Sequence, residues 1–457
     1  MHPNHIVQVQ QQSQIRQHVR RSHSHTFFNA LTDPDLLEQV DSLLPAHRER
    51  MFPPIQTLSM FMSQALSADR SCQQAVNAAS VARVQDGLAP CSTHTGGYCL
   101  ARQRLPVSLV QSLVQHTGTQ LSANAPVSWL WQGRPVRLVD GTTLTMPDTA
   151  SNREAFPPTS NQKAGVGFPL CRLVSMICLG SGAVLNAAIG PFRGKGGDEQ
   201  SLLRSILGSL TSGDVLIADA YYSTYLLLCE LHTRGVDGVF EQYGARKRST
   251  DFRKGQRLGP RDHLIVIPKP QRCPPWMSEE EFAKVPESLS VRELQVNRKI
   301  LVTTLLCAKR YPKAQVMTLY KSRWHIELDL RNIKTTLGME KLSCLSPAMI
   351  LKEVWVYLLA YNVIRLLMAQ AAISAKRHPR EISFKHTVQL WIAWGHYAPY
   401  DTDLATSGVL QILISQRRVG DRPGRVEPRA CKGGRPKYPP LTESRETARA
   451  RIRQYAH

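Results

Sequence analysis

The spacing of apolar residues changes along the chain and divides it into segments of different structure. Up to about residue 110, apolar side chains recur every three or four positions, as in LLEQVDSLL, IQTLSMFMSQAL and LVQSLVQHTG. That period places them on one face of a helix, so it predicts an N-terminal helical domain. From residue 135 the chain instead carries short β-branched runs bounded by Gly and Asp, which are typical of strands.

The central part of the chain predicts a mixed sheet. Five strand candidates follow one another in the order PVRLVDG, LCRLVSMICLG, AVLNAAIGPF, DVLIADAYY and VDGVFEQY. Two stretches with helical spacing, DEQSLLRSILGSL and TYLLLCELHTRG, separate the last three of them. The order β-β-β-α-β-α-β predicts an α/β domain in which three meandering strands are followed by crossovers.

Beyond residue 245 the pattern weakens and then becomes helical again. The segment to about 308 is basic and Pro-rich, with short strand candidates HLIVIPK and KILVTTLLC, and is predicted to be a β-rich insert. Helical spacing resumes at Pro312 and predicts further helices at 347–374, 384–397 and 405–416. The predicted divisions are a helical domain at 1–125, a core at 126–244, the insert at 245–308, the rest of the core at 309–345, C-terminal helices at 346–416 and a basic tail at 417–457.

The longest apolar run is VWVYLLAYNVIRLLMAQAAI, at residues 354–373. Asn362 and Arg365 interrupt it, and a central charge is unfavourable in lipid, so we expect a buried core helix and no membrane span. The N-terminal segment is rich in Gln and His and lacks the apolar stretch of a secretory signal. The expected location is therefore the cytoplasm.

The charge balance suggests a polyanionic partner. The chain has 57 Lys and Arg against 35 Asp and Glu, a net charge of +22, and the tail from Arg417 has twelve basic residues against four acidic ones. Such an excess favours nucleic acid, although ribosome-associated and membrane-surface proteins share it. The helical domain, with Arg20, Arg21, Arg102 and Arg104, is either a DNA-docking module or a plain scaffold.

The ten cysteines form no Cys-x-x-Cys pair and indicate reduced thiols, with no zinc site or disulfide framework.

Two aspartates stand where buried strands are predicted to end. Asp140 closes the first strand candidate of the sheet and Asp219 closes the fourth. A carboxylate at such a place is unfavourable unless it is paired or binds a metal ion. Taken singly, each could equally be a turn or cap residue. Together with a glutamate they would supply the hard oxygen ligands that Mg²⁺ or Mn²⁺ prefers.

A candidate glutamate lies in the segment YKSRWHIELDLRNIK, residues 320–334. On a continuous α-helix, Tyr320, Arg323, Glu327 and Lys334 would share a stripe roughly 60° wide. A phenol, a guanidinium, a carboxylate and an ammonium group on one stripe suit a phosphate-bearing substrate and a cation. The alternative is an ordinary solvated helix in which Arg323 and Glu327 form an ion pair four residues apart.

These blocks together resemble the DDE transposases of bacterial insertion sequences, in the insertion-sequence-four branch whose hallmark is Y-x2-R-x3-E-x6-K. Tyr320, Arg323, Glu327 and Lys334 satisfy that spacing, and VDGTTLTMPDT, NQKAGVGFPLCRLV, LIADAYYSTY and RPKYPPLTESRETAR resemble other family blocks. The resemblance implies an RNase H-like catalytic core interrupted by the β-rich insert, with helices on both sides in the chain. One departure is that Ala220, Tyr221 and Tyr222 follow the second Asp, where many relatives have Arg and Gly.

The resemblance also implies an activity. The enzyme would bind terminal inverted repeats, nick the 3′ strands with metal-activated water and join the freed 3′-OH to target DNA, as cut-and-paste transposition. Asp140, Asp219 and Glu327 would hold two Mg²⁺ (or Mn²⁺) ions. Tyr320, Arg323 and Lys334 would contact phosphates at the transposon ends.

Further expectations follow from the same resemblance. Trp276, in the insert, would stack on a flipped base, or would belong to a small core. Both transposon ends must be held together, so we expect a homodimer on DNA, in the bacterial cytoplasm and associated with the nucleoid.

Three other functions remain open at this point. A metal-dependent nuclease of the same fold would cleave DNA without joining it. A DNA-binding relative could keep the fold and lack activity. An RNA-binding or ribosome-associated protein would account for the charge but not for the three carboxylates.

Overall fold

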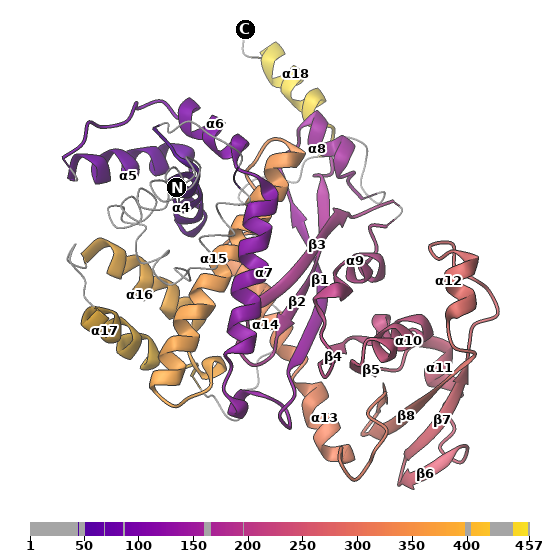
Figure 1. Ribbon diagram of the computed structural model, residues 1–457. Coiled ribbons are helices and arrows are strands. Elements are labelled where there is room, and N and C mark those ends of the chain that lie inside the picture. Colours follow the sequence, from indigo (N-terminus) through magenta and orange to yellow (C-terminus); the bar gives the residue numbers. More distant parts are fainter. Residues whose placement is uncertain are drawn as a thin grey trace, which may run out of the picture.

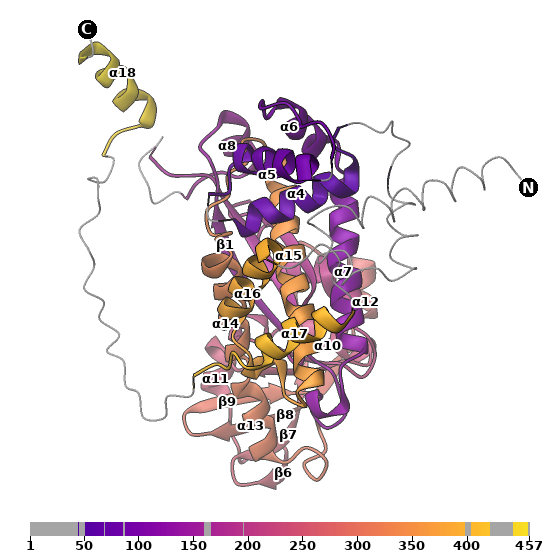
Figure 2. The ribbon, with the colours of Figure 1, turned by 90° about the vertical axis from the view of Figure 1, so that its left-hand side faces the viewer.

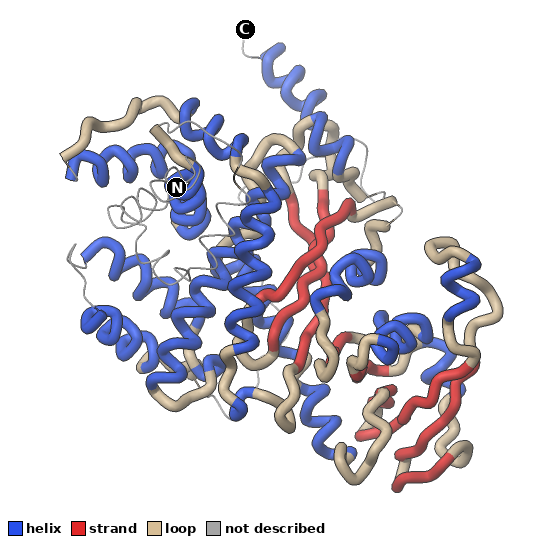
Figure 3. The backbone as a smooth tube through the Cα atoms, in the orientation of Figure 1, coloured by secondary structure: helices blue, strands red, loops and turns tan. Residues whose placement is uncertain are grey.

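The fold is described from a computed structural model, which places residue 44 and residues 51–67, 69–85, 87–159, 166–194, 196–397, 404–420 and 442–455. Helices and a single long sheet make up this part of the chain, a mixed α/β architecture (Figure 3). Arg20, Arg21, the predicted helix LLEQVDSLL except its final Leu44, and most of the basic tail lie outside the described residues.

The N-terminal helices form as the apolar spacing predicted. Their bounds are α4 Pro54–Leu66, α5 Cys72–Gln85, α6 Gly96–Arg104 and α7 Val107–Ala123. Helix α7 packs against the sheet at a close approach, because a Cβ atom built on Gly118 would lie 2.1 Å from the carbonyl oxygen of Val184. Arg102 is buried beneath Phe61 and Tyr98, so this arginine is no free DNA contact, whereas Arg104 is exposed.

Nine strands form one sheet in the order β3-β2-β1-β4-β5-β9-β8-β7-β6. The first five are β1 Val136–Thr145, β2 Leu170–Cys178, β3 Val184–Pro191, β4 Val215–Ala218 and β5 Asp237–Glu241. Strands β1, β2 and β3 are antiparallel neighbours, while β4 runs parallel to β1 and β5 parallel to β4. The predicted order of three meandering strands followed by crossovers is therefore confirmed.

The insert continues this sheet. Its strands are β6 Gln256–Gly259, β7 Asp262–Pro268, β8 Ser288–Val296 and β9 Lys299–Thr303, and β9 pairs antiparallel with β5. The short helices α11 Gly244–Ser249 and α12 Glu279–Lys284 belong to the same region, at the lower right of Figure 1. An ion pair of the fully buried Arg292 with Asp262, at 2.6 Å, lies between β8 and β7.

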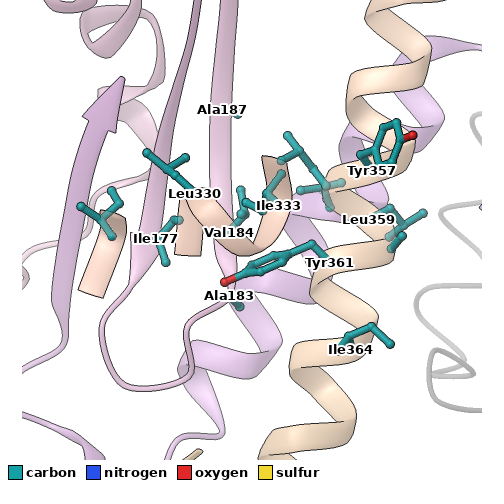
Figure 4. Packing of buried hydrophobic residues seen from close by; sticks show 14 of the residues in the cluster. Ile177, Ala183, Val184, Ala187, Leu330, Ile333, Tyr357, Leu359, Tyr361 and Ile364 are labelled. Atoms are coloured by element: carbon teal, nitrogen blue, oxygen red, sulfur yellow. The ribbon is translucent and has the colours of Figure 1, made fainter. Parts of the chain in front are cut away.

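The sheet is covered on both faces by helices. On one face lie α9 Glu199–Ile206 and α10 Tyr225–Thr233, whose leucines pack against β1, β2 and β4. On the other face lie α7 and the 28-residue helix α15 Pro347–Ser374, whose Tyr361 points toward Ala183 and Val184 (Figure 4). The most apolar 18-residue window of α15 is 83% buried within the protein, as predicted for a core helix. Helices α16 Phe384–Tyr397 and α17 Leu404–Ser415 pack on α15 (Figure 2).

The segment expected to be one continuous helix around Glu327 is instead built in three parts. Helix α13 covers Lys313–Lys321, α14 covers Trp324–Arg331, and a π-helical turn covers Asn332–Thr336. Between α13 and α14 the backbone bonds tighten, because the N–H groups of Ser322 and Arg323 reach back only three residues. The segment is therefore not one continuous α-helix, although Tyr320 and Glu327 both still interact with Arg323.

Candidate active site

Asp140 lies inside β1. The sequence placed it at the strand end, but β1 continues to Thr145 because β2 goes on pairing with the residues beyond it, from Gly141 opposite Val174 onward. Its Oδ1 accepts a hydrogen bond of 2.8 Å from the N–H of Gly141. A strand interior holds this carboxylate more rigidly than a loop would.

Asp219 follows directly on β4, as predicted. It caps the short helical turn Ala220–Tyr222, and its Oδ1 accepts a 2.9 Å hydrogen bond from the N–H of Tyr221. Strands β1 and β4 are parallel, with Leu138 opposite Ile217. Two residues further along each strand, Asp140 and Asp219 therefore come alongside each other, with side chains on the same face of the sheet.

Helix α14 brings Glu327 to this pair, with Arg323 between the acids. The Nη2 atom of Arg323 donates to Oε1 of Glu327 at 2.8 Å, and its Nη1 atom lies 3.9 Å from Oδ2 of Asp140. Helix α14 contacts β1, and Arg323 links Glu327 to Asp140, while Asp219 follows the neighbouring strand β4. The ion pair between Arg323 and Glu327 that the sequence left open does form, and it belongs to the site.

The carboxyl group of Asp140 has a raised pKa. Burial is the main cause and brings the pKa to about 6. The N–H of Gly141 opposes this, while the negative charges of Asp219 and Glu199 raise the pKa further. The positive charge of Arg323 lowers it but does not cancel the other effects. At neutral pH the carboxyl group of Asp140 is therefore still mostly ionised, and it becomes mostly protonated below about pH 6.

The donor atoms of the site suit a hard divalent cation, since carboxylate oxygens are its preferred ligands. Among the described residues, however, no three His, Cys, Asp or Glu side chains lie close enough together to hold one ion. Glu327 is held by Arg323. For Glu327 to join Asp140 and Asp219 as a ligand, its carboxylate must exchange Arg323 for the ion.

The other predicted contact residues differ in exposure. Tyr320 is only 5% exposed, and its side chain hydrogen-bonds Arg323, so it supports the guanidinium from within the protein. Lys334 lies in the π-helical turn and is half-buried. Trp276 is 47% exposed, with the guanidinium of Arg204 3.8 Å from its ring centre. The proposed DNA contacts of these residues stay predictions.

Glu199 is the residue near the site that the sequence did not single out. It begins α9, directly after the helix cap Asp198. An acidic residue in the first turn of a helix is common because the helix dipole stabilises it, so its position in DEQSLLRSIL carried no functional signal. Its proximity to Asp140 depends on how α9 packs under the sheet.

Comparison with known proteins identifies the class. Residues 131–363, just over half of the chain, match the family described as "Transposase DDE domain". The chain therefore belongs to the DDE transposases, which are DNA-cleaving enzymes. The matched region contains all three carboxylates and the whole insert.

A transposase of known name is similar to most of the chain. The chain is 28% identical over 358 residues to "Transposase InsG for insertion sequence element IS4" of Escherichia coli strain K12. This alignment covers 74% of the chain and 76% of the relative. Among solved structures, the piggyBac transposase synaptic complex with hairpin DNA aligns with 89% of this chain and 87% of its own, at 12% identity and a TM-score of 0.42.

The raised pKa of Asp140 predicts a pH effect on the ion-free protein. Between the unfolded pKa near 3.8 and the folded pKa of about 6, the native state binds more protons than the unfolded one. Stability must therefore fall as pH rises through this window, by about 3 kcal/mol for this group. Asp140→Asn should remove that loss and raise stability at pH 7. Urea unfolding at pH 4.5 and 7 in EDTA, with and without the substitution, measures it; an equal pH slope in both proteins would contradict the assignment.

Proposed function

We propose that this protein performs cut-and-paste transposition of an insertion sequence, binding the terminal inverted repeats, cleaving the ends and joining the 3′-OH to target DNA. The observation that carries the proposal is the alignment of Asp140 with Asp219 on adjacent parallel strands, with Glu327 and Arg323 facing them from α14. The net charge of +22 supports a DNA partner.

The arrangement of the first five strands supports an RNase H-like core. Three antiparallel strands stand at one end, β4 and β5 add in parallel, and helices lie on both faces. The insert departs after β5 and returns before α13, so it extends the sheet without separating the two aspartates from α14.

In this proposal Asp140, Asp219 and Glu327 hold two divalent ions, Mg²⁺ or Mn²⁺. When bound, such ions activate a water or 3′-OH nucleophile and stabilise the leaving oxygen. The chain's own part is to orient the DNA. Arg323 exchanges its carboxylate partners for a phosphate of the transposon end, while the buried ring of Tyr320 keeps the guanidinium in place.

Lys334 and Trp276 would extend this contact along the DNA. Lys334 would bind a phosphate beyond α14, and Trp276 would stack with a base on the side of its ring not covered by Arg204. We further propose a homodimer that holds both ends together, working in the bacterial cytoplasm on the nucleoid. The C-terminal helices α16 and α17 are its candidate contact surface.

Replacing Arg323 with Ala tests the DNA role of the site. We expect Arg323→Ala to bind end DNA at least tenfold more weakly. The slope of log K against the logarithm of the salt concentration should also become shallower by about one, because one phosphate contact is lost. Filter binding or anisotropy from 50 to 200 mM salt measures both. Arg331→Ala, an exposed arginine in the last turn of the same helix, is the matched control. An unchanged slope in Arg323→Ala would mean that Arg323 serves only as an ion-pair partner.

The decisive experiment for the function itself uses DNA carrying the element's own ends. Short inverted repeats flanking the reading frame, with a direct target duplication outside them, identify those ends. Purified protein with Mg²⁺ should cleave at the repeats and then join the released 3′ ends to a target plasmid. Cleavage without joining would favour the nuclease alternative, and specific binding without cleavage would favour the inactive relative.

A further inference from the structure

Helix α18 Arg445–Tyr455 is fixed to the rest of the protein through its first residue. The Nη1 atom of Arg445 lies 2.9 Å from Oδ2 of Asp148, whose side chain is only 10% exposed. The same atom donates to the carbonyl oxygen of Gly167 at 3.4 Å, and the guanidinium lies 3.7 Å from the ring centre of Phe168. These contacts join two blocks that the sequence singled out, NQKAGVGFPLCRLV and RPKYPPLTESRETAR, and they give the start of α18 a defined place.

Beyond this anchor, α18 stands outside the body of the protein, past the short helix α8 Ala150–Ala155 (Figures 1 and 2). Every side chain from Arg449 to Gln454 is exposed. Ile452, which is 66% exposed, is the only large apolar residue in that stretch. The helix therefore has no apolar stripe to bury, and packing against the core does not account for it.

Two arginines share one face of this helix. Arg449 and Arg453 are four residues apart, which separates them by about 40° around the helix axis. Among the described residues no acid pairs with either of them, whereas Arg451, on the opposite side, forms a 2.8 Å ion pair with Glu443. Like charges at this spacing destabilise a helix, and an 11-residue helix is marginal in water without support. A bound polyanion would remove this repulsion, which exposure to water alone leaves in place.

The anchor lies at the edge of the sheet that carries the active site. Strands β1 and β4 run parallel toward this edge, where Asp219 directly follows β4 and Asp148 comes after β1. Asp148 is eight residues after Asp140, and that length of chain spans at most about 29 Å. The same length of duplex DNA holds roughly eight base pairs. A duplex bound at the active site can therefore also reach α18.

We propose that α18 is a DNA-binding arm, on which Arg449 and Arg453 contact backbone phosphates of the duplex held at the active site. The inference goes beyond the proposed function and rests only on its DNA-binding part. Phosphate is the partner because an arginine guanidinium binds it through two parallel hydrogen bonds. Such contacts position the duplex without reading its sequence. Arg445 is the anchor of the arm, because its guanidinium is already engaged by Asp148 and Phe168.

The test is the binding of the full-length protein to two duplexes, one carrying the transposon end and one of unrelated sequence, from 50 to 200 mM salt. The double substitution Arg449→Gln and Arg453→Gln should weaken binding of both about tenfold. The slope of log K against the logarithm of the salt concentration should become shallower by about two, because two phosphate contacts are lost. Lysines at both positions keep the charge and should restore most of the slope.

Arg451→Gln is the matched control, because it removes the same charge from the opposite side of the same helix. Its slope should stay within about half a unit of that of the unsubstituted protein. An unchanged slope in the double glutamine variant, or an equal loss in Arg451→Gln, would overturn the inference. A changed oligomeric state without DNA, with the slope unchanged, would instead make α18 a contact between copies of this chain. Failure of the unsubstituted protein to bind either duplex would overturn the proposed function itself.

Discussion

Glu327→Gln is expected to abolish metal-dependent cleavage of end DNA, by at least about a thousandfold, because catalytic groups that act as a unit lose most of their effect when one is removed. Specific binding of end DNA should stay within a few-fold. The glutamine can still accept the hydrogen bond that Arg323 now donates to Glu327, so the local packing is preserved. Cleavage in Mg²⁺ and gel-shift binding, on the same DNA, measure the two effects.

Two companion substitutions sharpen this prediction. Asp140→Asn should abolish cleavage equally, since both carboxylates face the same guanidinium. Glu340→Gln, at an exposed position just beyond the π-helical turn, changes the charge in the same way and should cleave normally. Full cleavage by Glu327→Gln or Asp140→Asn would falsify the assignment of the metal ligands.

The second large effect is expected two residues further along α14. Asp329 is fully buried and accepts hydrogen bonds from Arg380, at 2.8 Å to each carboxylate oxygen, and from the buried Arg365. Arg380 also donates to the carbonyls of Cys178 and Leu179 at the end of β2. This network anchors the inner face of α14 to α15 and the sheet, and so sets where Glu327 stands.

Asp329→Ala should lower the free energy of unfolding by about 3–5 kcal/mol, because it leaves buried guanidinium charge without its partner. Urea or guanidinium denaturation measures the change. Adding Arg365→Met to Asp329→Ala should recover part of the loss, since one of the uncompensated charges is removed with its partner. Asp69→Ala, in an exposed loop, serves as the surface control. A loss below about 1 kcal/mol for Asp329→Ala would show that the network does not anchor the helix.

Glu327 and Asp329 show what the local sequence can and cannot predict about the site. Both are acids in the run IELDL, and helical geometry places them roughly 200° apart on α14, so only one of the two can face Asp140. Which of them faces the site and which faces the core depends on Arg365 and Arg380, which come later in the chain. The resemblance to a family motif, and not helical periodicity, indicated Glu327.

Local pattern determined the elements themselves. Alternating and continuous apolar runs predicted the first five strands, two strands of the insert and the core helix α15, because such patterns report directly which faces a segment can bury. The two aspartates, Asp140 and Asp219, were visible because charge at the end of an apolar run is unusual. The helical break at Ser322 was not predicted, since apolar spacing alone does not detect where backbone hydrogen bonds tighten.

Tertiary structure alone decided how these parts form a site. It placed Arg323 between Glu327 and Asp140, turned Tyr320 inward and brought Glu199 against Gly141. Each of these depends on the register of β1 with β4 and on the packing of α9 and α14, which join segments far apart in the chain. The sequence by itself thus determined which elements form and which acids are available, because those follow from local burial and charge. Their mutual distances arise only from long-range contacts.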